Sequence, residues 1–173
     1  MSKIAVIYKS KNGTTKRYAE WIAEALDASI FEASDVKPTQ LADYDVIVYG
    51  GWVFASKISG VKLVTEHACK ALVVFSVGLA DPKISDYTEL LAENFKPEFP
   101  ERIKVFHLRG GIDYKKMGFV QRGMMSLVKK SAEKKEPDKR TGEEQAVLET
   151  FDGTFDFTER AAIEPLVAYV RLL

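Results

Sequence analysis

Side chains suited to holding an anion gather between residues 10 and 15. This segment, SKNGTT, supplies hydroxyl and amide groups around a glycine, where the backbone can turn with positive φ. A strand of buried type, Ile4–Tyr8, precedes it, and a helix-forming segment begins at about Thr14. Such a strand–loop–helix unit points backbone N–H groups and a helix N-terminus at one place, which favours phosphate. Asn12-Gly13 is also a strong hairpin signal, but no alternating second strand follows it.

Two later loops have the residues to hold a flat ring beside that phosphate. Residues 50–55, GGWVFA, offer an aromatic wall, and residues 76–81, SVGLAD, offer backbone N–H groups and small side chains. Apolar walls with a few convergent polar groups suit a planar heteroaromatic ring that carries a phosphate tail. Core packing is the competing interpretation, as strong as the ligand interpretation for Phe54 and weaker for Trp52.

Other chemistries lack the residues that they need. The chain has no G-x-x-x-x-G-K-[ST] and no G-x-G-x-x-G motif, which argues against P-loop and dinucleotide sites. Cys69 is expected late in a helix, as an inert thiol rather than a nucleophile. His67 and His107 are far apart and belong to no cluster with metal-ligand spacing. We therefore predict neither a metal site nor a catalytic side chain.

The composition is that of one globular domain over residues 1–173. Its 25 basic and 25 acidic residues cancel, so the net charge predicts no nucleic-acid partner. A single cysteine excludes an internal disulfide and favours a reducing compartment. No apolar run approaches the roughly 20 residues that span a bilayer. The apolar run near the N-terminus is too short for a signal peptide. We expect a cytoplasmic protein, with membrane association as an alternative.

The elements that would position these loops alternate between strand and helix. Strands are expected at 4–8, 29–33, 45–51, 72–77 and 103–108, and helices at 15–26, 61–71 and 86–95. Lys37-Pro38 starts a helical turn, and Pro97 and Pro100 close the third helix. This alternation predicts a parallel sheet with helices on both faces. Ligands of such sheets lie beyond the carboxyl ends of the strands, where the three loops fall.

Residues 113–150 break this rhythm as a basic helical insertion and loop. A helix is expected over Tyr114–Lys135, with one apolar face and a net charge of +6 in a neutral chain. The apolar residues are Met117, Val120, Met124, Leu127 and Val128, and the charged ones are Lys115, Lys116, Arg122, Lys129, Lys130, Lys134, Lys135 and Glu133. Such a helix suits a membrane surface, or it simply packs its apolar face on the domain.

The stretches that follow are read as a loop and a final helix. Residues 133–145 are charged and contain proline and glycine, which predicts a solvated or partly mobile loop. A last helix is expected over 156–173, with Asp156 as N-cap and Glu159 as its capping-box partner. Pro165 inside that pattern predicts either a kink or the true start of the helix.

The cradle segment SKNGTT resembles the flavodoxin signature [TS]-x-T-G-x-T, which wraps the phosphate of FMN. Ser10, Gly13 and Thr15 match it, and Asn12 replaces the usual threonine. The resemblance implies FMN as cofactor and an α/β, flavodoxin-like fold: a three-layer, doubly wound, five-stranded parallel sheet of order 2-1-3-4-5. The implied phosphate residues are Ser10, Lys11, Asn12, Gly13, Thr14 and Thr15. Those implied around the isoalloxazine ring are Gly51, Trp52, Val53, Phe54, Ser76, Val77, Gly78, Leu79 and Asp81.

Three segments also resemble a narrower group, the flavodoxin-like, menaquinone-dependent protoporphyrinogen oxidases. They are DYDVIVYGGWVFASKISG, VVFSVGLADPK and HLRGGIDYKKMGFVQRGMMSLVKK. In that group a basic insertion with aromatic and methionine residues follows the fifth strand, where residues 113–135 stand here. This resemblance implies a porphyrinogen as electron donor and a quinone as acceptor.

Three functions follow from these observations. The first is an FMN protein that transfers electrons or hydride equivalents to and from a partner protein or small molecule, with the flavin supplying the redox chemistry. The second is an enzyme that passes electrons from a porphyrinogen to a quinone, with residues 114–135 meeting porphyrin propionates or the membrane. The third is a flavin-free module that binds a partner protein, which the intact hydroxyl-rich cradle argues against.

Overall fold

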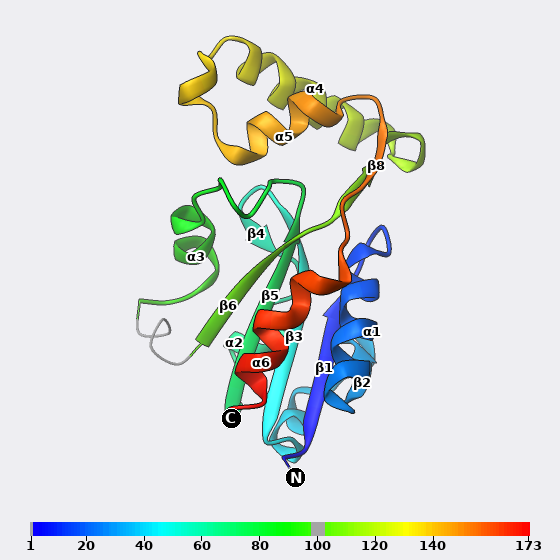
Figure 1. Ribbon diagram of the computed structural model, residues 1–173, viewed down its shortest axis with the longest axis vertical. Helices are drawn as coiled ribbons and strands as arrows, with labels where there is room; N and C mark the ends of the chain where they lie inside the picture. Colours follow the sequence, from blue (N-terminus) through cyan, green and yellow to red (C-terminus); the bar gives the residue numbers. More distant parts are fainter. Residues whose placement is uncertain (1, 98–102) are drawn as a thin grey trace.

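The computed structural model describes residues 2–97 and 103–173, and it has a parallel sheet at its centre (Figure 1). Its strands are β1 (Ile4–Lys9), β2 (Ser29–Glu32), β3 (Val46–Phe54), β5 (Ala71–Gly78) and β6 (Ile103–Arg109). The order is β2-β1-β3-β5-β6, and the two-residue strand β4 (Lys57–Ile58) pairs antiparallel with the end of β3. Counted over the five parallel strands, this is the predicted order 2-1-3-4-5.

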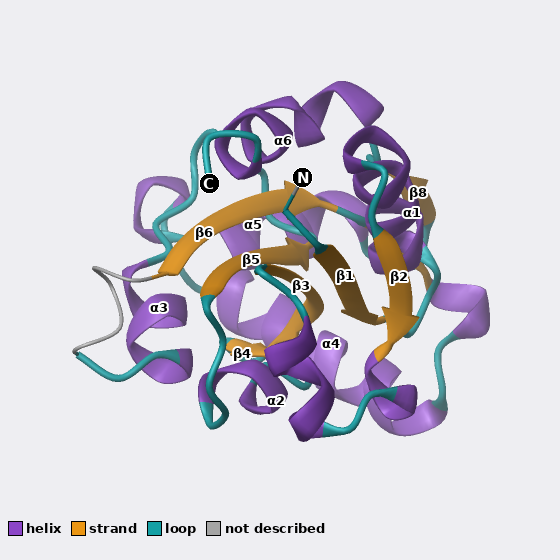
Figure 2. Cartoon of the chain, turned by 90° about the horizontal axis from the view of Figure 1, so that it is seen from below, coloured by secondary structure: helices purple, strands orange, loops and turns teal. Residues whose placement is uncertain are grey.

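Helices cover both faces of the sheet, as Figure 2 shows from below. On one face, α1 (Thr14–Leu26) and α6 (Glu164–Val170) bury side chains such as Ile22 and Leu166 against alternate residues of the strands. On the other face lie α2 (Lys62–Thr65), α3 (Thr88–Asn94) and the 3₁₀ helix Pro38–Asp43. The strands are buried on both sides, which explains their continuous apolar sequences. The three-layer fold is as predicted.

Strand β3 does not end at Gly50-Gly51, contrary to the prediction, but continues to Phe54. Gly50 pairs with Tyr8 on one side and Phe75 on the other. A Cβ atom at Gly50 would overlap the ring of Phe75, so this glycine allows close packing inside the sheet rather than a turn.

The helix predicted over 61–71 is also wrong, because α2 spans only Lys62–Thr65. Its β-branched residues weaken helix formation. Cys69 therefore lies in the connection to β5, where it is half-buried and burial raises the pKa of its thiol. Helix α3 begins at Thr88 instead of Asp86, and Pro100 lies outside the described residues.

A helical hairpin stands above the carboxyl ends of the strands, joined to the sheet by a two-stranded ribbon (Figure 1). The ribbon consists of β7 (Gly111–Asp113) and β8 (Thr154–Asp156). Between them lie the 3₁₀ turn Tyr114–Lys116, α4 (Phe119–Glu133), the turn Pro137–Lys139 and α5 (Gly142–Thr150). The expected helix over 114–135 is thus confirmed only from Phe119 to Glu133.

The loop predicted over 133–145 is wrong from Gly142 onward. The Thr141 Oγ1 accepts from the backbone N–H of Glu144 at 3.1 Å, and the Glu144 carboxylate accepts from the backbone N–H of Thr141 at 2.9 Å. This capping box starts α5 in spite of the charged sequence around it.

The long C-terminal helix predicted over 156–173 is also shorter than expected. Asp156 ends β8, and its Oδ1 accepts from the backbone N–H of Thr158 at 3.0 Å instead of capping a helix. Glu159 is followed by a 3₁₀ turn at Arg160–Ile163, and α6 begins at Glu164. Pro165 therefore stands in the first turn and marks the true start of the helix, one of its two predicted roles. Among the described residues, no helix combines the length and apolarity that crossing a bilayer requires.

Candidate functional site

The loop between β1 and α1 forms the cradle that the sequence predicts. Gly13 adopts the left-handed conformation, with φ of 90°, at the N-cap position of α1. No side chain caps this helix, and its first turn contains no acidic residue. The Gly13 N–H donates to the Ser10 Oγ at 3.1 Å, which fixes the turn. The first N–H groups of a helix have no partner within it, so this end attracts an anion.

Thr15 gives the cradle an unsatisfied polar group. The residue is 1% exposed, and its Oγ1 has no hydrogen-bond partner among the residues that the structure describes. Leaving a buried hydroxyl without a partner costs about 1–3 kcal/mol. A phosphate oxygen bound at the end of α1 would accept from this hydroxyl, so the cradle fits a phosphate in both charge and hydrogen bonding.

The cradle opens into a cavity of about 550 Å3 between the sheet and the hairpin. This volume lies within the usual range for small-molecule sites. Trp52 and Val77 are partners on the adjacent strands β3 and β5, and the Lys11 Nζ lies 5.2 Å from the centre of the Trp52 ring. Ten of the fifteen predicted residues line the cavity: Lys11, Asn12, Thr14, Thr15, Trp52, Val53, Phe54, Val77, Gly78 and Leu79.

The other five predicted residues do not belong to the cavity lining. Ser10 and Gly13 form the turn of the cradle itself. Gly51 lies in β3, where a Cβ would meet the Ser59 carbonyl oxygen at 2.6 Å. The remaining two, Ser76 and Asp81, contact residues from β6.

Ser76 is buried, with its Oγ 2.7 Å from the Nδ1 of His107, and the His107 ring stacks on Tyr87 at 3.6 Å between centroids. Burial lowers the pKa of His107 to about 4, so the imidazole is neutral at pH 7. The side chain of Ser76 therefore supports the strand end from outside the cavity. Asp81 lies 3.8 Å from Arg109 and is likewise a support for the loop.

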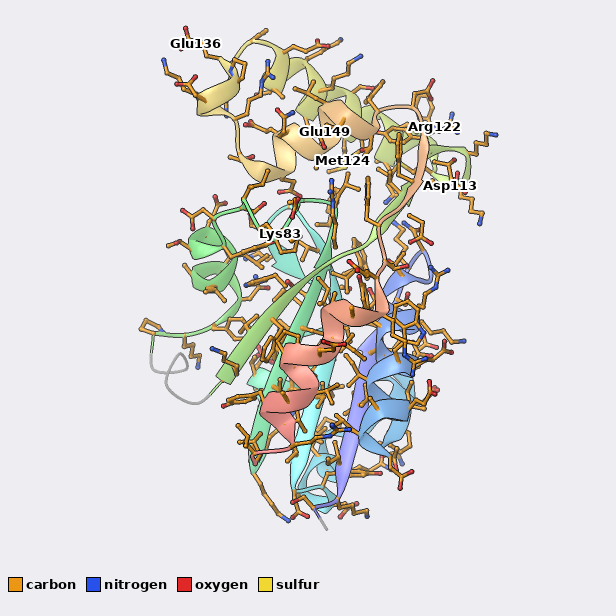
Figure 3. All side chains as sticks on the ribbon, viewed as in Figure 1. Lys83, Asp113, Arg122, Met124, Glu136 and Glu149 are labelled. Atoms are coloured by element: carbon orange, nitrogen blue, oxygen red, sulfur yellow. The ribbon has the colours of Figure 1, made fainter. Side chains whose placement is uncertain are left out.

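The hairpin supplies a roof that the sequence did not assign to the site. It is largely apolar, and Figure 3 shows Met124 on the side of the hairpin that faces the sheet. The contributing apolar residues are Met117, Met124, Met125, Leu127, Val128 and Val147. The four-residue spacing of Met124 and Val128 correctly predicted an apolar helix face. That face lies above the cradle because β8 pairs with β7 and so holds the hairpin over the sheet.

Acidic side chains form one edge of the cavity. Glu89 comes from α3, and Glu143 and Glu144 come from α5. Desolvation of the Glu143 carboxylate is the larger cause of its raised pKa, and repulsion from the nearby Glu89 and Glu144 carboxylates raises the pKa further. Glu144 is tied to Lys135 at 2.6 Å. Neither α5 nor its capping box was anticipated, although T-x-x-E at 141–144 is a recognisable start signal.

Arg109 connects the roof to the loop after β5. Its Nε donates to the Leu79 carbonyl at 3.1 Å, and its guanidinium carbon lies 3.8 Å from the centre of the Phe157 ring. One terminal nitrogen lies 3.6 Å from the carboxylate of Glu149 on α5. The arginine thus holds the hairpin in register with a loop that lines the cavity.

A doubly wound sheet of order 2-1-3-4-5, with a phosphate-type cradle after its first strand, defines the flavodoxin-like class of α/β proteins. A family model described as "Flavodoxin domain" matches residues 5–139. The chain belongs to this flavodoxin domain family.

Solved structures similar to the chain include flavodoxins at low sequence identity. Flavodoxin 2 from Bacillus cereus is 20% identical over 62% of this chain and 84% of that one, with a TM-score of 0.46. A flavoprotein in complex with FMN from Lactobacillus acidophilus is 16% identical over 63% and 93%, with a TM-score of 0.42. Comparison with curated proteins gave no match.

Proposed function

We propose that this protein binds FMN between the cradle and the hairpin and uses it for oxidoreduction. The unsatisfied, buried hydroxyl of Thr15 at the uncapped end of α1 carries this proposal, because both features suit a phosphate. Membership of the flavodoxin domain family supports it. The FMN found in the Lactobacillus acidophilus flavoprotein is a property of that protein, and we extend it to this chain as part of the proposal.

The residues of the chain divide the work of holding the cofactor. Thr15 and the backbone of the cradle would bind the phosphate, while Trp52 and the residues Val77–Leu79 would flank the ring. The apolar roof would exclude water from the ring, which strengthens the electrostatic effect of nearby groups on it. When bound, FMN supplies one- and two-electron redox chemistry. The protein binds, orients and shields it.

Titration of the purified, flavin-free protein with FMN tests this function. Quenching or polarisation of flavin fluorescence gives Kd, and riboflavin is the matched control because it lacks only the phosphate. We expect FMN to bind at least about tenfold more tightly than riboflavin, since charge-assisted hydrogen bonds to phosphate are lost in the latter. Equal affinities would refute the cradle as a phosphate site. Failure to take up FMN would favour the flavin-free, partner-binding alternative.

A second candidate is an oxidoreductase that acts on a small molecule rather than a carrier that docks with a protein. The observation that favours it is the hairpin roof, whose methionine and valine side chains cover the cavity. A ring held beneath this roof would be reached more readily by a small substrate than by a protein surface. Porphyrinogen and quinone, the pair implied by the sequence resemblance, are the first substrates to assay. An anaerobic assay with both, run beside reduction of a protein electron acceptor, separates enzyme from carrier.

A further inference from the structure

The outer surface of α4 carries large apolar side chains with no cover. Phe119 is 93% exposed, Val120 73% and Leu127 68%. Leu127 follows Phe119 by two helical turns, and Val120 precedes Leu127 by seven residues, so the three lie on adjacent rows of one helix face. Burying a side chain of this size is favourable by a factor of about ten or more in an equilibrium constant. A face with three of them therefore has a strong tendency to bind something.

Basic residues continue this face at both ends. Lys130 and Lys134 extend the row of Phe119 and Leu127 at three- and four-residue spacing, and both are exposed. Lys115 and Lys116 precede the helix in the turn and are also exposed. Of these four, Lys115, Lys130 and Lys134 form no ion pair with any residue that the structure describes, whereas Lys116 lies 3.7 Å from Asp113. The face is thus apolar in the middle and positively charged at its ends.

We propose that this face of α4 docks on the surface of an anionic lipid bilayer. Charge complementarity selects the occupant: residues 114–135 have a net charge of +6 in a chain whose total is zero. An exposed phenylalanine and leucine with flanking lysines is the pattern of a helix that lies in the membrane interface. The apolar side chains enter the boundary between headgroups and acyl chains, while the lysines contact the anionic headgroups.

Docking in this orientation would bring the cavity to the lipid. Met124 and Leu127 line the cavity, yet they are 39% and 68% exposed, so the cavity wall continues into the docking face. A lipid-soluble electron donor or acceptor could then enter the cavity from the bilayer. This consequence rests on the proposed function, whereas docking itself does not.

Cosedimentation of the full-length protein with vesicles tests the docking. We expect the protein to pellet with vesicles that contain phosphatidylglycerol, to remain in solution with pure phosphatidylcholine, and to be released by added salt. The double variant Phe119→Ser/Val120→Ser and the double variant Lys130→Glu/Lys134→Glu should each weaken binding by about tenfold or more, and neither changes a residue that lines the cavity. These side chains are exposed, so the fold is retained. Leu172→Ser, 85% exposed at the far end of the molecule, is the matched apolar control and should bind as the unaltered protein does.

Three results would overturn the docking. They are failure of the protein to bind phosphatidylglycerol vesicles, binding that persists in both α4 variants, and a dimer in size-exclusion chromatography that the Phe119→Ser/Val120→Ser variant abolishes. The last would identify a second copy of the chain as the occupant. FMN titration of the same samples keeps the two proposals apart. Vesicle binding without FMN uptake would remove the proposed redox function and leave the docking intact.

Discussion

Replacing Thr15 with valine should have opposite effects on the flavin-free protein and on FMN binding. Valine has the same shape and nearly the same helix propensity as threonine. It removes a hydroxyl that is buried without a partner, which costs the flavin-free protein about 1–3 kcal/mol. We therefore expect Thr15→Val to stabilise that form by about 1 kcal/mol or more, which raises Tm by roughly 2–4 °C for a domain of this size.

The same change should weaken FMN binding. A hydrogen bond from the Thr15 hydroxyl to an ionised phosphate is worth about 1.5–3 kcal/mol. Its loss corresponds to an increase in Kd of roughly 10- to 150-fold. Thermal unfolding of the flavin-free protein and FMN titration of the same sample measure both effects.

Thr150→Val is the matched control for this pair of measurements. Thr150 is buried to the same degree as Thr15, but its Oγ1 donates to the Ala146 carbonyl at 2.7 Å and it does not line the cavity. This variant should lose about 1 kcal/mol of stability and keep the Kd for FMN. The reasoning is refuted if Thr15→Val is destabilised like Thr150→Val, or if its Kd for FMN is unchanged.

Two further predictions concern the surroundings of the cavity. Gly110→Ala should cost about 1–3 kcal/mol of stability and weaken FMN binding, because its Cβ would lie 2.7 Å from Val77 and 3.1 Å from the Thr14 hydroxyl. Gly118→Ala is the control and should change neither quantity, because a Cβ at Gly118 meets open space. Urea unfolding and FMN titration of both variants test this. For His107, whose pKa is lowered to about 4 by burial, the unfolded state binds more protons between about pH 4 and 6.5, so stability falls as pH drops through this window. The free energy of unfolding should fall between pH 7 and pH 5, and it should fall less in His107→Asn than in the unaltered protein. An equal fall in both proteins would contradict this.

The sheet and the cradle were predictable because they depend on local sequence. Continuous apolar runs identified the buried strands, and the polar glycine loop after the first strand identified the cradle. The glycine pair Gly50-Gly51 led to a wrong prediction of the strand end, because Gly50 is required by the Phe75 ring on the neighbouring strand rather than by a turn. Such a requirement depends on tertiary contact and leaves no local signal.

The roof of the site could not be predicted for a related reason. A hairpin folds over the cradle only because β8 returns beside β7 and Arg109 ties Glu149 to the loop after β5. These contacts join residues that are far apart in the sequence, such as Gly111 and Asp156. The start of α5 did have a local signal, the capping box of Thr141 and Glu144. The charged composition of residues 133–145 nevertheless favoured a loop in the sequence-based prediction.

Parallel titration of the flavin-free protein with FMN and riboflavin tests the central claim most directly. The claim is that the loop between β1 and α1 recognises the phosphate of a flavin whose ring lies under the hairpin. It predicts saturable binding of one FMN per chain, with riboflavin bound at least about tenfold more weakly. Binding of neither flavin, or equal binding of both, would contradict it.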